Sequence, residues 1–338
     1  MVRKHVTIHD ELRLDDIAKH LGLTARYPDA SLRDEAAAAC IARVEPILRP
    51  LLPCTGEKIL NALAAHFRVA FEEVRGEDDI ALLEDKYLRQ KHEYGFARLR
   101  DELANPDVDA LLFHRMHGRE TDHDQWVAVL NLQKTATKCY WNKGHELTHR
   151  IAEPQQQNLP FRRHRFQAGN AVESLIDAIT AEIAYYAPAF RPLVLQESRA
   201  IRVLDFACLE RLRAAFAPSA SRLATMKAAV KLWPRPVVAL TAEFRGRKGD
   251  PTRDMDLRVT LESSSTTASA NGLRFFPNMR VPRSSPIYSC YLTDGDTCGD
   301  ENLGSWTTRD GDRLADITVC SMAKSFGSRG LYILIAAR

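Results

Sequence analysis

The sequence has no CxxC pair, no long hydrophobic run and little net charge, and the first two absences argue against particular classes of protein. Its seven cysteines are odd in number and scattered, so we expect free thiols rather than a disulfide framework. No stretch approaches the ~18 apolar residues of a membrane-spanning helix. The first residues lack the apolar core of a signal peptide, which favours a cytoplasmic protein with no membrane partner. A net charge of +3 argues neither for nor against a nucleic-acid partner, which only local basic clusters could indicate.

The composition is that of an ordinary globular protein, and the pattern of apolar residues changes from helical to β-like along the chain. The 338 residues are 45% hydrophobic and 27% charged, which suggests two or three folding units at ~150 residues per domain. Helical periodicity dominates up to the "WPRP" at 233–236, and β-like runs follow. We expect an α+β protein with four segments. They are a helical N-terminal region at 1–55, a central domain at 56–200, a helix-turn-helix-like segment at 201–236 and a β-rich domain at 237–338.

Several elements can be expected from periodicity. The stretch 56–74 has an apolar stripe at helical spacing and predicts one long amphipathic helix. The runs 107–115 and 126–133 are apolar and flanked by polar turn residues, which predicts two neighbouring strands. The stretch 170–188 predicts a helix with Asn170 as its N-cap and Glu173 completing a capping box.

The β-rich segment contains six strand-like runs separated by Gly, Asp, Asn, Pro and Ser clusters. They are "VVALTAEFRG" (237–246), "DLRVTLESSS" (256–265), "LRFFP" (273–277), "IYSCYLT" (287–293), "RLADITVCSM" (313–322) and "LYILIAA" (331–337).

The stretch "NKGHELTHRIAEP" contains the pattern H-E-x-x-H at His145, Glu146 and His149. On a helix, residues four apart project from one face, so both imidazoles can reach one Zn²⁺. Glu146 lies one step round the helix, where it can take a proton from a metal-bound water. The pattern also occurs by accident on exposed helices, so it needs a third ligand as support.

The downstream candidates for that third ligand are Glu153, His164, Glu173, Asp177 and Glu182. Glu153 is excluded as a ligand because Pro154 follows it and ends the helix there. Glu173 and Asp177 share one face of the next helix, one turn apart. This spacing favours Glu173 as the ligand and Asp177 as a support that orients His145 or His149 through its other ring nitrogen.

Other residues near the motif have both a functional and an ordinary interpretation. Trp126–Leu132 either pairs as an edge strand with an extended peptide substrate or is a plain internal strand. The basic residues Arg162, Arg163 and Arg165 either recognise acidic substrate residues or are solvated. The phenols of Tyr185 and Tyr186 either stabilise an oxyanion or pack in the core.

The segments "GHELTHRIAEP" and "ESLIDAITAEIAYYAP" together resemble the ImmA/IrrE family of zinc metallopeptidases, which includes the PprI-like radiation-response proteases. Glu173 and Asp177 match the family's third ligand and its Asn/Asp. Ile176, Ile179 and the "AYYAP" ending depart from the family pattern by apolar or small exchanges. The resemblance covers roughly residues 56–190.

This resemblance implies a zincin-like core of mixed sheet and active-site helices, with one Zn²⁺ (or Mn²⁺) per chain. It implies cleavage of a protein substrate, a helix-turn-helix transcriptional repressor, in a stress or mobile-element response. By position it implies a helix-turn-helix-like segment at 203–233, with possible phosphate contacts, and a GAF-like sensor domain at 237–338. Two alternatives stay open: a DNA-binding regulator with a structural zinc, and a protease of a toxin or phage-defence system.

Overall fold

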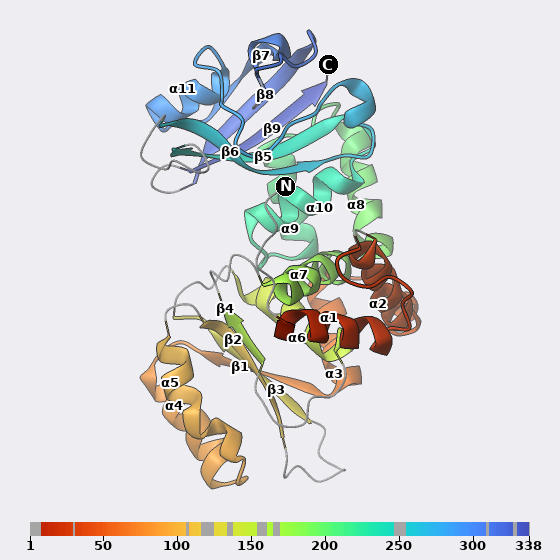
Figure 1. Cartoon of the computed structure of the whole chain (residues 1–338), viewed down its shortest axis with the longest axis vertical. Coiled ribbons are helices and arrows are strands. Elements are labelled where there is room, and N and C mark those ends of the chain that lie inside the picture. The colour runs from red at the N-terminus through yellow and green to blue at the C-terminus, as the bar shows by residue number, and fades with distance from the viewer. Residues whose placement is uncertain are drawn as a thin grey trace. The chain divides into compact units, whose positions relative to one another are not determined.

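The computed structural model in Figure 1 describes residues 8–29, 31–105, 108–115, 125–133, 138–153, 170–246, 255–308, 311–326 and 330–337, and the backbone of 161–164. The chain forms two compact units. The first comprises Met1–Phe190 with Phe216–Ser221, and the second comprises Arg191–Ala215 with Arg222–Arg338. Each contains a β-sheet and helices, so the predicted α+β class is confirmed at that level.

The helices of the first unit are α1 (Ile8–His20), α2 (Leu32–Leu48), α3 (Gly56–Phe67), α4 (Glu77–Leu83), α5 (Leu99–Ala104), α6 (Cys139–Ala152) and α7 (Ala171–Ala184). Shorter 3-10 or π turns occupy Arg49–Leu51, Glu84–Arg89 and Tyr94–Arg98. The strands are β1 (Val69–Val74), β2 (Val108–His114), β3 (Trp126–Asn131) and β4 (Phe161–His164).

These strands form one mixed sheet in the order β1-β3-β2-β4. The expected neighbouring strands are β2 and β3, which pair antiparallel, whereas β1 runs parallel to β3. Hydrogen bonding on both sides makes β3 an internal strand, so the interpretation of Trp126–Leu132 as an edge strand is wrong. Within the described residues the sheet edges are β1 and β4.

Helices cover both faces of this sheet (Figure 1). Alternate residues of β2 and β3, such as Leu111 and Val129, join a core with apolar residues of α4 and α5. On the other face α6 lies against β2 and β3, and α3 and α7 pack against α6. The helix that carries the HExxH motif is therefore held between a sheet and two helices.

The long helix expected at 56–74 is wrong in its second half. Helix α3 ends at Phe67, Arg68 adopts a left-handed conformation (φ 55°), and β1 begins at Val69. The sequence "VAFEEV" is rich enough in β-favouring residues to pair with β3, and this pairing overrides the helical periodicity.

The helices of the second unit are α8 (Ala187–Ala200, from Arg191 onward), α9 (Phe206–Phe216, up to Ala215), α10 (Arg222–Leu232) and α11 (Pro286–Thr293). Its strands are β5 (Val237–Arg245), β6 (Asp256–Ser264), β7 (Thr297–Asn302), β8 (Thr318–Ser325) and β9 (Gly330–Ala337). They form an antiparallel sheet in the order β6-β5-β9-β8-β7, with 3-10 turns at Ser269–Asn271 and Leu303–Ser305.

Four of the six expected β-like runs correspond to strands: two contain β5 and β6, the run 331–337 matches β9 to within one residue, and the run 313–322 overlaps the first five residues of β8. The run 287–293 is instead the helix α11, because Pro286 starts it and the Ser285 hydroxyl accepts a hydrogen bond from the Ile287 amide. The run 273–277 forms no strand, and β7 comes from the polar "TCGDEN", which has no apolar alternation.

The four segments expected from the sequence do not correspond one to one to the two units. The N-terminal helices α1 and α2 pack on α7 and belong to the first unit. Most of the helix-turn-helix-like segment at 201–236 belongs with the β-rich sheet, because α10 packs on β5 and β6.

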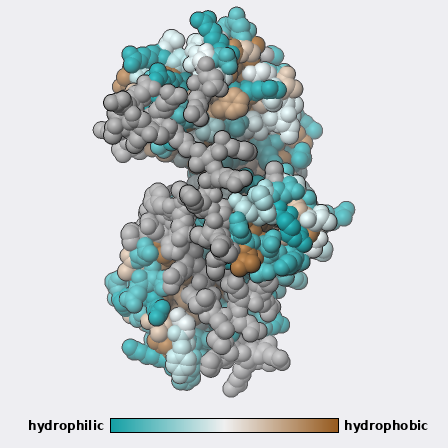
Figure 2. Space-filling view, in the orientation of Figure 1, coloured by the Kyte–Doolittle hydropathy of each residue, from teal (hydrophilic) through white to brown (hydrophobic). Residues whose placement is uncertain are grey.

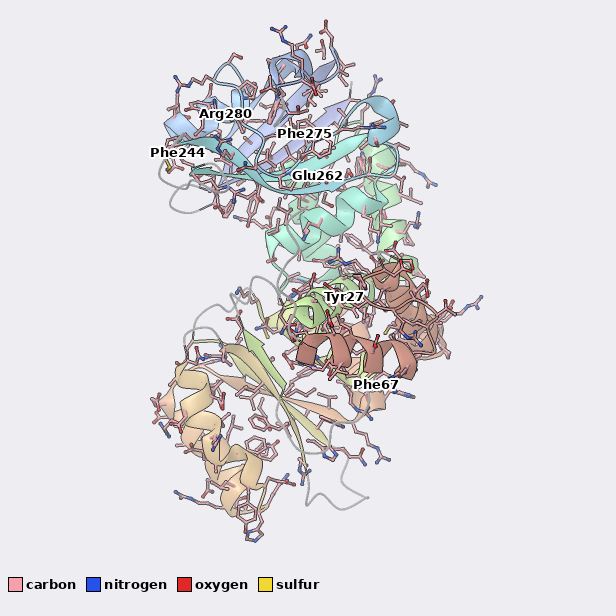
Figure 3. The ribbon with its side chains drawn as sticks, in the orientation of Figure 1. Tyr27, Phe67, Phe244, Glu262, Phe275 and Arg280 are labelled. Atoms are coloured by element: carbon pink, nitrogen blue, oxygen red, sulfur yellow. The ribbon has the colours of Figure 1, made fainter. Side chains whose placement is uncertain are left out.

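Aromatic packing in the core, the surface and the helix lengths complete the description of the fold. In the second unit Phe275, labelled in Figure 3, meets Trp306 edge-on at 5.1 Å between ring centroids. On the face in Figure 2, hydrophobic residues form small separate spots among hydrophilic ones. Among the described residues, no helix combines the length and the apolar character needed to cross a membrane.

Trp306 provides a test of the core of the second unit. It is fully buried, and its indole donates to Glu301 at 3.2 Å. We expect Trp306→Ala to lower the free energy of unfolding by ~3–5 kcal/mol, because it leaves a cavity. Denaturation followed by circular dichroism measures this, with the half-exposed Phe276→Ala as the control. Equal midpoints for the two variants would contradict the described core.

Candidate metal centre

Helices α6 and α7 bring together two motifs that lie far apart in the sequence. The side chain of Asn170 caps α7 by accepting from the amides of Val172 (3.0 Å) and Glu173 (3.2 Å). Gly144 lets the helices cross closely, since a Cβ there would lie 3.3 Å from Thr180 Cγ2 and 3.5 Å from the Cβ of Ala184. The cap and the close crossing fix Glu173 beside the histidines of α6.

The side chains of His145, His149 and Glu173 converge on one point. Their possible ligand atoms all lie within 4.8 Å of one another. His145 Nε2 is 3.1 Å from Glu173 Oε2 and 3.0 Å from His149 Nε2, which is 3.7 Å from Glu173 Oε1. Both histidines are buried, and the Glu173 side chain is 16% exposed.

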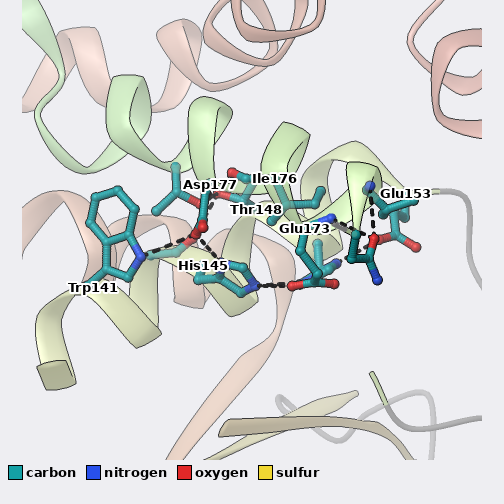
Figure 4. Close-up of polar contacts among 12 residues, drawn as sticks. Trp141, His145, Thr148, Glu153, Glu173, Ile176 and Asp177 are labelled. Carbon is teal, nitrogen blue, oxygen red and sulfur yellow. Dashed lines mark hydrogen bonds and ion pairs between the residues drawn. The ribbon is translucent and has the colours of Figure 1, made fainter. Parts of the chain in front are cut away.

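The other nitrogen of each ring faces a different carboxylate. His145 Nδ1 lies 3.0 Å from Asp177 Oδ1, which also accepts from the indole of Trp141 at 3.3 Å (Figure 4). His149 Nδ1 lies 2.6 Å from Glu153 Oε1. A carboxylate only accepts, so in the neutral ring each Nδ1 carries the hydrogen and each Nε2 presents a lone pair.

This tautomer leaves three electron-pair donors pointing at one another with no hydrogen between them. Two imidazole Nε2 atoms and a carboxylate at 3.0–3.7 Å repel unless a cation lies among them. Two nitrogens and one carboxylate are the ligand types that Zn²⁺ takes at catalytic sites, and Mn²⁺ accepts them too. The residues present therefore fit a metal ion.

The electrostatics of the described side chains also favour a positive charge at this point. Burial opposes protonation of His149, but Glu173 and Glu153 raise its pKa well above the usual value. Burial by itself would raise the pKa of Glu173, yet His149 and His145 hold it well below its usual range. Burial likewise opposes the charge on Glu153, whose pKa is lowered by His149 and Arg13.

Glu146, the expected base, is fully buried on α6 directly after His145. The HExxH pattern predicts that it lies one step round the helix from the ligand face, where it would reach a water on a bound metal rather than the metal itself.

Three residues of this arrangement have contacts that the sequence did not predict: Glu153, which was considered only as a ligand, Arg13 and Trp141. Helix α6 does end at Ala152, as Pro154 led us to expect, but the Glu153 side chain still reaches back to His149. Arg13 on α1 donates to both oxygens of Glu153. The i,i+4 spacing of His149 and Glu153 could have indicated the contact between them. Arg13 is 140 residues from Glu153 in the sequence, and Trp141 belongs to no recognisable motif, so no sequence signal indicated their contacts.

The two tyrosines considered for the oxyanion directly follow the last residue of α7, Ala184. Tyr185 belongs to an aromatic cluster with Tyr140, Phe190 and Phe216 at 5.2–6.0 Å between ring centroids. Tyr185 and Tyr186 are buried and follow Glu173 by 12 and 13 residues, or ~18 Å along a helix. Their burial favours the packing interpretation, and a role for either phenol at an oxyanion stays a prediction.

The basic residues of "PFRRHRF" are described only in part. Arg162 and Arg163 lie on β4, where they pair with Leu111 and Ala110. Their side chains and the whole of Arg165 fall outside the described residues, so their expected role stays a prediction.

A scan against protein-family models finds none that matches this chain. A search of curated proteins finds no match either. The resemblance to the ImmA/IrrE family therefore rests on the two motifs in the chain itself.

Glu173 and Glu182 allow a matched test of the third ligand, because both lie on α7. We expect wild type and Glu182→Gln to bind one Zn²⁺ per chain. Glu173→Gln should lose more than ~100-fold in affinity, since even an outer partner costs ~10–100-fold. Metal analysis after dialysis, with a competing chelator, measures this. Equal affinity of Glu173→Gln and Glu182→Gln would exclude Glu173 as a ligand.

Proposed function

We propose that this chain is a zinc-dependent endopeptidase of the ImmA/IrrE type that acts in the cytoplasm. The observation that carries the proposal is the convergence of His145, His149 and Glu173 on one point, with Glu146 adjacent on the same helix. A structural zinc has four protein ligands, whereas the described residues offer three here, which suits a catalytic zinc with water in the fourth position.

Each residue of the site has a separate role in the proposed peptide hydrolysis. Zinc bound by the three ligands would polarise the scissile carbonyl and lower the pKa of a water molecule to ~7. Glu146 accepts a proton from the attacking water and gives it to the leaving nitrogen. Asp177 holds the ring of His145 in the tautomer that offers Nε2.

The substrate follows from the resemblance rather than from the site. We propose a helix-turn-helix transcriptional repressor, cleaved in a stress or mobile-element response. Because β3 is internal, an extended substrate would pair instead with an edge strand. Within the described residues β4 is one such edge strand and its sequence includes Arg162 and Arg163, so we propose acidic residues in the substrate segment that pairs with it.

The second unit suits a role in regulation. We propose that it acts as a GAF-like sensor, and its five-stranded antiparallel sheet with helices packed on it supports this. A protease of a toxin or phage-defence system would use the same chemistry and differ only in its substrate.

The alternative of a DNA-binding regulator has less support. The helices α9 and α10 form the expected pair with a turn between them, but their arginines engage acidic partners. Arg211 contacts Glu197 at 2.8 Å, and Arg213 and Arg222 share Glu210 at 2.9 and 2.6 Å. Charges already paired within the protein contribute less to phosphate binding.

Glu146→Gln tests the function, because the amide keeps the size of the side chain and cannot accept the proton. We expect cleavage of a co-expressed repressor from a neighbouring gene to fall by ~10²–10⁴-fold, while zinc stays bound. Immunoblotting of the repressor and metal analysis measure the two quantities.

Glu182→Gln is the control and should cleave like wild type. A chelator should abolish cleavage, and added Zn²⁺ should restore it. Undiminished cleavage by Glu146→Gln would exclude the proposed base. If wild type and Glu146→Gln both bound specific DNA in a gel-shift assay and neither cleaved the repressor, the DNA-binding regulator would be favoured instead.

A further inference from the structure

The carboxylate of Glu153 lies between the metal-site histidine His149 and an arginine from the first described helix. Its Oε1 is 2.6 Å from His149 Nδ1, and both its oxygens lie 3.0 Å from Arg13 Nη2. The Glu153 side chain is 3% exposed and that of Arg13 is 19% exposed. A charge buried this deeply needs partners that stay in place, and here one is a candidate ligand and the other is on α1.

We propose that Glu153 is a positioning residue that sets the ring orientation and tautomer of His149, and that Arg13 anchors Glu153, so that helix α1 is part of the metal centre. The proposal rests on the metal site put forward above. It gives the N-terminal helix a role that neither the HExxH motif nor the family resemblance assigns to it.

The two carboxylates behind the histidines differ in ways that predict their relative importance. Asp177 is 49% exposed, lies 3.0 Å from His145 and also accepts from Trp141. Glu153 is buried and lies 2.6 Å from His149. Because hydrogen bonds to charged groups strengthen as water is excluded, removing the charge of Glu153 should weaken metal binding more than removing that of Asp177.

Helix α2 supplies a matched control for Arg13. Arg43 donates to the carbonyl of Ile151 at 3.1 Å, in the last turn of α6, but contacts neither Glu153 nor a candidate ligand in the described hydrogen bonds. Arg13 and Arg43 thus both link the N-terminal helices to the end of α6. Only Arg13 reaches the carboxylate behind His149.

The experiment measures Zn²⁺ affinity by competition with a chromophoric chelator for full-length wild type, Glu153→Gln, Arg13→Gln, Asp177→Asn and Arg43→Gln. Circular dichroism first establishes that each variant is folded. We expect Glu153→Gln to weaken binding by ~100-fold and Arg13→Gln by ~10-fold, the two ends of the range for outer-shell partners. Asp177→Asn should fall between, and Arg43→Gln should stay within about twofold of wild type.

The double variant Arg13→Gln/Glu153→Gln separates positioning from general loosening. If Arg13 acts through Glu153, it should bind Zn²⁺ about as tightly as Glu153→Gln alone, because the second change has nothing left to disturb. The visible spectrum of bound Co²⁺ should shift in Arg13→Gln and not in Arg43→Gln. Should Glu153→Gln not fold, the single Arg13→Gln comparison with Arg43→Gln carries the same test.

Additive losses in the double variant, or equal effects of Arg13→Gln and Arg43→Gln, would overturn the inference and leave the metal site standing. Wild type that binds no Zn²⁺ would overturn the proposed function, and this inference with it.

Discussion

The first unit depends on one electrostatic constraint, which is the convergence of two imidazole nitrogens and a carboxylate on a point that requires a positive charge. His145, His149 and Glu173 come from two helices, and each donor is held from behind. The Asn170 cap fixes the first turn of α7, and carboxylates fix both rings. Such an arrangement costs free energy without a cation, which explains why so many surrounding contacts serve to maintain it.

Other elements of the first unit surround α6, the helix that carries both histidines. The sheet and α3 hold α6 from two sides, and the N-terminal helices close around its far end through Arg13 and Arg43. The region that the sequence presents as a separate helical extension thus contacts the end of the helix that carries His145 and His149. The second unit has its own sheet and its own core.

The sequence predicts well what depends on local spacing. The i,i+4 histidines, the shared helix face of Glu173 and Asp177, the Asn170 cap and the strand pair β2–β3 follow from periodicity and capping alone. It predicts poorly what depends on distant partners: β1 is a strand because β3 pairs with it, and β3 is internal for the same reason. Glu153 illustrates both cases. The proline at 154 correctly predicts the end of the helix, but nothing local predicts the contact of the Glu153 side chain with the distant, partly buried Arg13.

The central claim is that the three donors hold one metal ion, and anomalous X-ray diffraction at the zinc edge tests it most directly. A crystal of the zinc-loaded protein should show one peak at ~2.0–2.2 Å from Nε2 of His145, Nε2 of His149 and an oxygen of Glu173. No peak among these residues, or a zinc held elsewhere such as between the Cys298 and Cys320 thiols at 3.9 Å, would contradict the account.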